Sequence, residues 1–223
     1  MAGNTATDHS DVTRRVREVL QGDVQTLRLV SYRLTEDAGS GHVSLLARLE
    51  RTTGQRTTGQ HTTSQHTATP EPGEPVCVEA EAETLADALF TGLVARLVGE
   101  HPSLATLRLS HEQVTHSRST QPPAHQAQAR VGVRNAYGAE LLFTASAPSA
   151  GLALLSATLD AVDHFINAEV AYTRIWQALH HARRQHRTDL EKTYTELLAE
   201  LVRTTSYADV ISRLQGGQGS TRP

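Results

Sequence analysis

The sequence predicts an α+β protein made of two tandem, pseudo-symmetric βββα units followed by a long C-terminal amphipathic helix. Three observations support this fold class. Polar and apolar residues alternate in six short segments, each set of three is followed by a segment of helical periodicity, and Leu-Arg-Leu opens the first segment of both sets. The second set therefore repeats the first, which indicates an internal repeat.

The composition fits a globular protein and excludes several functional classes. The chain has 223 residues, of which 38% are hydrophobic and 20% charged, with a formal net charge of −3. This balance does not suggest binding to nucleic acid or to an anionic membrane surface. No apolar run approaches the roughly 20 residues that span a bilayer, and the N-terminus lacks the apolar core of a signal peptide. With a single cysteine, the protein is expected in the cytoplasm, without nucleic-acid or membrane partners.

Residues 1–23 are predicted to form a polar tail and a short helix. Residues 1–11 are small and polar, whereas apolar residues recur at helical spacing between Val12 and Leu20. Gly22 then provides a C-cap that ends the helix.

The first βββα unit is predicted over residues 24–103. The alternating segments Leu27–Thr35 and His42–Glu50 flank a turn rich in glycine and form a hairpin. In Val76–Glu83 the alternation is strict, which predicts a strand with one buried face. The segment Thr84–Val98 carries a leucine stripe and begins with a threonine as N-cap, so a helix closes the unit.

Residues 51–75, between the second and third strands, are predicted to be a disordered insertion. The pentapeptide Arg51–Gln55 recurs at Arg56–Gln60 and then degenerates, and Ala68 is the single apolar residue of the segment. Such a segment cannot contribute to a core, and doubling the length of a loop costs only about 0.6 kcal/mol. A binding role for the insertion is the less favoured alternative.

The second βββα unit is predicted over residues 104–167. Its strands are expected at Leu107–Thr115, His125–Asn135 and Ala139–Ala147, and an Asn-Ala-Tyr-Gly turn joins the last two. The apolar stripe of Ser149–Ile166 predicts the helix that closes this unit.

A C-terminal helical segment is predicted over residues 168–214, followed by a disordered tail at 215–223. One amphipathic helix is expected to continue to about Arg203, and its stripe is too long to be covered by two small units. Because a large exposed stripe usually marks an interface, we expect a homodimer held by this helix together with the sheet-bearing domain. The alternative is that the helix folds back onto its own domain. The expected interface residues are Ile175, Leu179, Leu190, Leu197 and Leu201.

No motif in the sequence predicts catalysis, a metal site or a cofactor. His111 and His116 are five residues apart on a strand and therefore point to opposite faces. Asp160, Asp163 and His164 share a helical face, which we interpret as solvated surface rather than as a set of metal ligands. The sequence contains no phosphate-binding loop, dinucleotide-binding fingerprint or nucleophile elbow.

The third strand of the first unit places Cys77 on its polar face, beside Glu79, Glu81 and Glu83. Neighbouring carboxylates disfavour a thiolate nucleophile, so Cys77 is interpreted as a small strand residue. The row of carboxylates is interpreted as a solvated sheet face, and contact with a cationic ligand group is the alternative.

The tandem pattern resembles the C-terminal allosteric (dimerisation) domain of the 2-isopropylmalate synthase and citramalate synthase family. The likeness covers residues 24–168 and rests on the first predicted hairpin, on Val76–Leu97 and above all on Ala129–Ile166. Family members carry a (β/α)₈ barrel ahead of this domain, which condenses acetyl-CoA with a 2-oxo acid at a divalent metal. The barrel's acidic motif and metal-binding His-x-His are absent here, so the resemblance implies a non-catalytic, stand-alone regulatory protein of leucine or related amino-acid biosynthesis.

The resemblance also implies a ligand site and partners. Family members bind a branched-chain amino acid between the two units, near the turns from the third strand to the helix, here Ala80–Thr84 and Ser146–Ala150. The implied partners are a small amino-acid effector, a synthase that consists of the barrel alone, and a second copy of the chain. The alternative from another class is a small enzyme of specialised metabolism that uses the cleft between the units. The implied effector-binding residues are Glu81, Glu83, Thr84, Ala147, Pro148 and Ser149.

Overall fold

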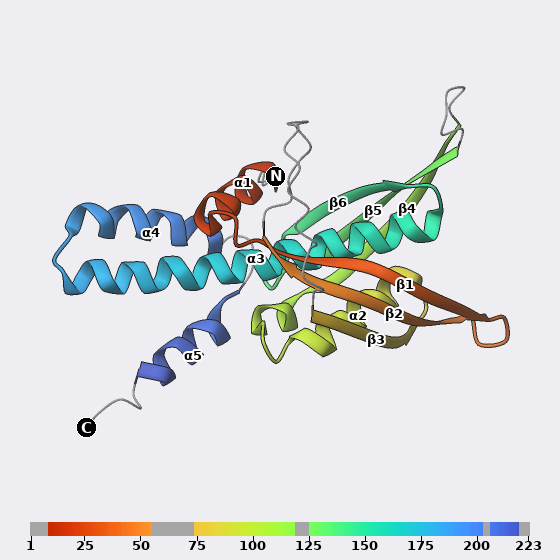
Figure 1. The fold of residues 1–223 in the computed structure, drawn as a ribbon, viewed down its shortest axis with the longest axis horizontal. Coiled ribbons are helices and arrows are strands. Elements are labelled where there is room, and N and C mark those ends of the chain that lie inside the picture. The colour runs from red at the N-terminus through yellow and green to blue at the C-terminus, as the bar shows by residue number, and fades with distance from the viewer. Residues whose placement is uncertain (1–8, 55–73, 119–124, 203–205, 219–223) are drawn as a thin grey trace, which may run out of the picture.

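The computed structural model describes residues 9–54, 74–118, 125–202 and 206–218 and shows an α+β fold (Figure 1). Two three-stranded antiparallel sheets, ordered β1-β2-β3 and β4-β5-β6, are each followed by a helix, which confirms the predicted class and order of elements. The elements are α1 (His9–Leu20), β1 (Gln25–Asp37), β2 (His42–Thr53), β3 (Glu74–Ala82), α2 (Leu85–Leu97), the 3₁₀ helix η1 (Pro102–Thr106), β4 (Arg108–Arg118), β5 (His125–Arg134), β6 (Glu140–Ala147), α3 (Ala150–Arg184), α4 (Thr188–Val202) and α5 (Ala208–Gln218).

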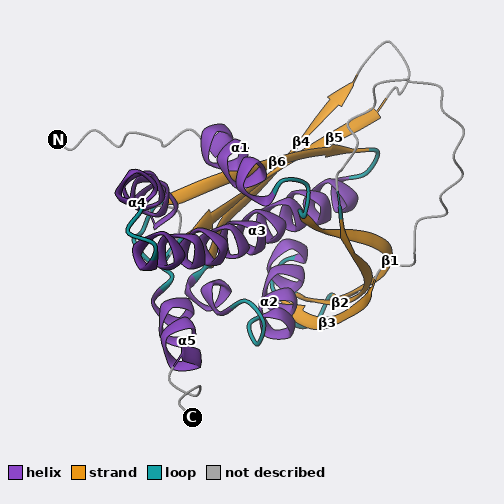
Figure 2. Ribbon diagram, turned by 60° about the vertical axis from the view of Figure 1, so that its left-hand side comes forward, coloured by secondary structure: helices purple, strands orange, loops and turns teal. Residues whose placement is uncertain are grey.

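The helices that close the two units lie between the two sheets (Figure 2). Helix α2 packs on β2 and β3, α3 packs on β4, β5 and β6, and the two helices contact each other. One continuous cluster of buried apolar side chains draws on both sheets and both helices. The two units therefore share a single hydrophobic core.

The two sheets have the same pairing geometry as well as the same strand order. The first strand of each sheet has a β-bulge at the same place in the repeat, at Val30 in β1 and at Ser110 in β4. Equivalent positions also pair with each other in both sheets. The matching pairs are Leu29–Leu49 with Leu109–Val133 in the first two strands, and Leu45–Ala80 with Ala129–Ala145 in the last two.

Gly92 allows α2 to lie close to β3. A Cβ atom at Gly92 would stand 2.4 Å from Val78 Cγ1 and 3.0 Å from Ala80 Cβ, closer than side chains pack. At Gly151, near the start of α3, the nearest atom would be 3.5 Å from an added Cβ, which is an ordinary contact. The two glycines thus differ in the space beside them.

This difference predicts opposite effects of the same substitution. Gly92→Ala should lower the free energy of unfolding by about 1–3 kcal/mol through overpacking, although alanine favours the helix by about 1 kcal/mol. Gly151→Ala should raise the free energy of unfolding by up to about 1 kcal/mol. Urea denaturation measures both changes, and a Gly92→Ala protein as stable as the wild type would contradict the close packing.

The prediction of one helix from residue 168 to 203 is wrong. Helix α3 begins at Ala150 and crosses the predicted boundary at 167–168, and the chain then reverses so that α4 runs back along it (Figure 1). At the reversal His186 adopts a φ of 56°, in the left-handed region. The Arg187 N–H donates a 3.0 Å hydrogen bond to the Ala182 carbonyl, which closes the end of α3.

The apolar stripe that was expected to be exposed is buried against other helices of the same chain. A second buried cluster joins α1, α3, α4 and α5, with α1 packed on α3. The alternative, in which the helical segment folds back onto its own chain, therefore describes the structure. The prediction that this stripe is exposed is wrong, and the helix-mediated dimer depends on that exposure. Dimerisation itself stays a prediction. Ile175, Leu179 and Leu201 are buried, and Leu190 and Leu197 are half-buried.

The bounds of the predicted insertion and of both predicted tails differ from the structure. Strand β2 continues to Thr53 and β3 begins at Glu74, so both ends of the predicted insertion belong to the sheet, where Arg51 pairs with Glu74. Residues 55–73, which make up the rest of that insertion, lie outside the described residues. Helix α1 begins within the predicted N-terminal tail, and α5 extends to Gln218 within the predicted C-terminal tail.

Candidate functional site

The two turns from the third strand to the helix meet at one place in the structure. Thr84 caps α2 and Ser149 caps α3, each by accepting a 3.2 Å hydrogen bond from a backbone N–H in the first turn. A Cβ at Gly151 would lie 3.5 Å from Leu85 Cδ2, so the starts of the two helices are in contact. Because helix N-termini carry partial positive charge, this junction favours an anionic group.

The first strand of each unit reaches the helix of the other unit. Glu112 in β4 accepts a 3.1 Å hydrogen bond from the Thr84 hydroxyl at the start of α2. The Tyr32 hydroxyl in β1 lies 3.6 Å from the position of a Cβ at Gly151, near the start of α3. Tyr32 and Glu112 occupy the same place in the segments Leu-Arg-Leu-Val-Ser-Tyr and Leu-Arg-Leu-Ser-His-Glu. The junction therefore has a phenol on one side and a carboxylate on the other.

Four of the six effector residues implied by the resemblance belong to this junction or lead into it. Thr84 and Ser149 are the two N-caps. The half-buried Ala147 ends β6, and the exposed Pro148 links it to the cap of α3.

The remaining two implied residues are carboxylates of the first unit. Glu81 lies on the outer face of β3, where the Ser44 hydroxyl donates a 2.7 Å hydrogen bond to it, so its carboxylate points away from the helices. Glu83 is exposed in the turn before α2. Tyr32 and Glu112 were not predicted from the sequence, although the two repeats, aligned residue by residue, place them at matching positions.

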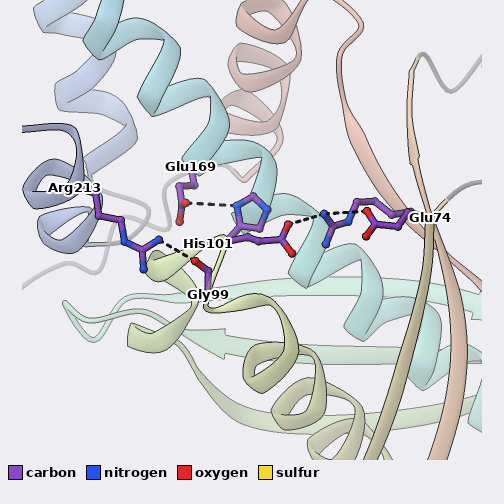
Figure 3. Close-up of polar contacts among 7 residues, drawn as sticks. Glu74, Gly99, His101, Glu169 and Arg213 are labelled. Carbon is purple, nitrogen blue, oxygen red and sulfur yellow. Dashed lines mark hydrogen bonds and ion pairs between the residues drawn. The ribbon is translucent and has the colours of Figure 1, made fainter. Parts of the chain in front are cut away.

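A second polar cluster lies at the other end of α2 (Figure 3). His101 Nδ1 is 3.4 Å from Glu169 Oε1, a polar contact longer than an ordinary hydrogen bond. The Ser103 N–H donates a 2.9 Å hydrogen bond to the other Glu169 oxygen, and both side chains of the pair are buried. From α5, Arg213 donates a 2.9 Å hydrogen bond to the Gly99 carbonyl. These contacts fix η1 to α3 and α5 to the turn that follows α2.

Arg51, in β2, extends this cluster to the first sheet. Its guanidinium is 2.7 Å from a Glu100 carboxylate oxygen and 3.8 Å from Glu74. The hydrogen bond from Arg51 lowers the pKa of Glu100. The stabilising contribution of this pair is therefore present above the unfolded-state pKa of Glu100 and is lost as the pH falls through its folded-state value. The cluster connects separate structural elements, and its carboxylates already contact other groups of the same chain.

The interpretation of Asp163 and His164 as solvated surface is wrong. His164 is buried, and Asp163 accepts a 3.0 Å hydrogen bond from the Leu27 N–H in β1. One turn further along α3, Asn167 accepts from the Gln25 N–H at 2.8 Å and donates to the Gln25 carbonyl at 2.7 Å. Side chains of α3 thus pair with the backbone of the edge strand β1. Within the described ranges, no group of three or more His, Cys, Asp or Glu side chains could hold a metal ion.

A small apolar cavity lies between α1, α3 and α4. Its volume is about 10 Å³, and Val12, Ile175, Leu197 and Leu201 contribute to its lining. This volume holds about one water molecule, so the cavity is too small for an amino-acid ligand.

Comparison of the sequence with known families gives no matching family model, and comparison with curated proteins gives no match. None of the helices in the described part of the chain is long and apolar enough to cross a bilayer. The function is therefore inferred from the chain's own residues and fold.

Proposed function

We propose that the chain is a non-catalytic regulatory and dimerisation unit of the 2-isopropylmalate synthase and citramalate synthase type, which binds a small amino acid. The observation that carries the proposal is the pair of βββα arrangements with equal strand registers, whose helices meet at their N-termini. The proposed effector site is the junction of Thr84, Ser149, Tyr32 and Glu112.

The charges of the junction suit an amino acid, which carries one carboxylate and one ammonium group. The Glu112 carboxylate already lies at the start of α2, where Thr84 donates to it, so the ligand carboxylate is assigned to the start of α3. There it is within reach of the Tyr32 hydroxyl. The ligand ammonium group is assigned to Glu112, which would then exchange a hydroxyl donor for a charged one.

The proposed protein partner is a synthase barrel that lacks a regulatory domain of its own. A regulatory unit without acyl-CoA chemistry of its own would act by changing the activity of such an enzyme. The proposed pathway is the synthesis of leucine or a related amino acid, and the proposed compartment is the cytoplasm, where the exposed Cys77 would stay reduced.

A thermal-shift screen with the amino acids and their 2-oxo acids tests the proposal. A branched-chain amino acid at 100 times its Kd should stabilise the fold by about 2.7 kcal/mol, which raises the Tm by roughly 5–10 °C. Glu112→Gln should abolish the shift, because the ammonium group loses its counter-charge. The matched control Glu196→Gln, at an exposed carboxylate of α4, should keep it.

Two results of the screen would contradict the proposal. One is the absence of any stabilisation by amino acids at millimolar concentration. The other is turnover of a 2-oxo acid by the purified protein, which would support the alternative of a small enzyme.

A further inference from the structure

The outer face of the first sheet exposes large apolar side chains. Leu46 in β2 is 48% exposed and Val30, at the bulge of β1, is 45% exposed. Cys77, in β3, is exposed on the same face. The equivalent positions of Leu46 and Val30 in the second sheet are Arg130 and Ser110. Exposure of large apolar groups at these two positions is therefore a property of the first sheet and not of the repeat.

Opposite charges flank the exposed leucine on one row across the strands. Arg33 in β1 pairs with Leu46, and Leu46 pairs with Glu79 in β3. Neighbouring strands are about 4.8 Å apart, so the two charged residues lie about 10 Å apart with the leucine between them. Across the three strands the row is positive, apolar and negative. It is therefore complementary in charge to the same row of a second copy that runs in the opposite order.

We propose that this face, defined by Val30, Arg33, Leu46, Arg48, Cys77 and Glu79, binds the same face of a second copy of the chain. The two-fold axis lies parallel to β2 and passes between the two Leu46 side chains. This rotation exchanges β1 with β3, so Arg33 faces Glu79 of the second copy and Glu79 faces Arg33 of the second copy. The contact is isologous, and the two sheets pack with their strands within about 30° of each other.

The charges select this axis over the other one in the sheet plane. An axis perpendicular to the strands would place Arg33 against Arg33 of the second copy and Glu79 against Glu79 of the second copy, and both contacts are repulsive. The parallel axis places Arg33 against Glu79 twice and has one like-charge contact, between Arg48 and Arg48 of the second copy, which Glu50 offsets as an opposite charge one row away on the same strand. Dimerisation through this face does not depend on effector binding.

The size of the face sets the expected affinity. The ladder between β2 and β3 has nine residue pairs, so the face is about 30 Å long and about 14 Å wide. Such a face is smaller than a standard interface, which buries about 800 Å² per partner. A dissociation constant in the micromolar range is expected.

Sedimentation equilibrium of charge variants tests the proposal. The wild type should be dimeric at roughly 100 µM. Arg33→Glu should be monomeric, because it places two pairs of glutamates in contact, and the double variant Arg33→Glu/Glu79→Arg should restore the dimer. Leu46→Arg should also be monomeric, whereas Leu142→Arg, on the outer face of the second sheet where Leu142 is 43% exposed, should remain dimeric.

Two results would overturn the proposal. They are a wild type that is monomeric at roughly 100 µM, and a dimer that Leu142→Arg dissociates and Leu46→Arg leaves intact.

Discussion

Replacing Leu201 with glutamate should lower the free energy of unfolding by about 3–5 kcal/mol, because it buries a charge that has no partner. Leu201 is 3% exposed and belongs to the cluster that joins α1, α3, α4 and α5. The single tryptophan, Trp176, packs against the same cluster, so its fluorescence reports the loss of this packing during urea denaturation.

The control is the same substitution at an exposed position of the same helix. Ala199→Glu, two residues before Leu201, should change the free energy of unfolding by less than about 0.5 kcal/mol. If Leu201→Glu leaves the stability unchanged and instead dissociates a dimer, the stripe is an intermolecular interface and the intramolecular packing described here is wrong.

Glu169→Leu should lower the free energy of unfolding by about 3 kcal/mol. The change removes the acceptor of the Ser103 N–H and the partner of His101, both buried at the end of α2. The double variant His101→Leu/Glu169→Leu should recover part of this loss, because replacing both members of a buried pair is less costly than removing one.

The matched control is Glu196→Leu, at an exposed position of α4, which should have little effect. Urea denaturation of His101→Leu, of Glu169→Leu and of the double variant gives the coupling energy between His101 and Glu169. Strictly additive effects would show that the two side chains do not interact, contrary to their 3.4 Å separation.

The strands could be predicted because their signal is local. In β3, Val76 and Val78 are buried while Cys77 and Glu79 are exposed, as the alternation of the sequence requires. The predicted N-cap at Thr84 is confirmed as well, since a capping side chain acts within one helical turn.

The break between α3 and α4 was missed because no glycine or proline marks it. A histidine, His186, takes the left-handed conformation that usually selects glycine. The remaining signal was the start of α4, where Thr188 and Glu191 have the Thr-x-x-Glu spacing of a capping box. An uninterrupted apolar stripe outweighed it, although a stripe of that kind is equally compatible with two helices that pack on each other.

The residues of the candidate site could be predicted only in part, because the junction joins distant segments. The Thr84 cap is visible in the sequence, but its bond to Glu112 spans 28 residues and depends on how the two units pack. The bond between Asp163 and the Leu27 backbone spans 136 residues and has no periodic signal. Alternation and helical spacing report which face of an element is buried, and they do not report which element covers it.

Amide chemical shifts measured during an amino-acid titration test most directly whether the two units share one effector site. On addition of a branched-chain amino acid, the amides of Thr84 and Leu85 should shift together with those of Ser149 and Gly151, with one common dissociation constant. Shifts confined to one turn, shifts confined to another part of the molecule, or unchanged spectra at millimolar concentrations of every amino acid would contradict the proposed site.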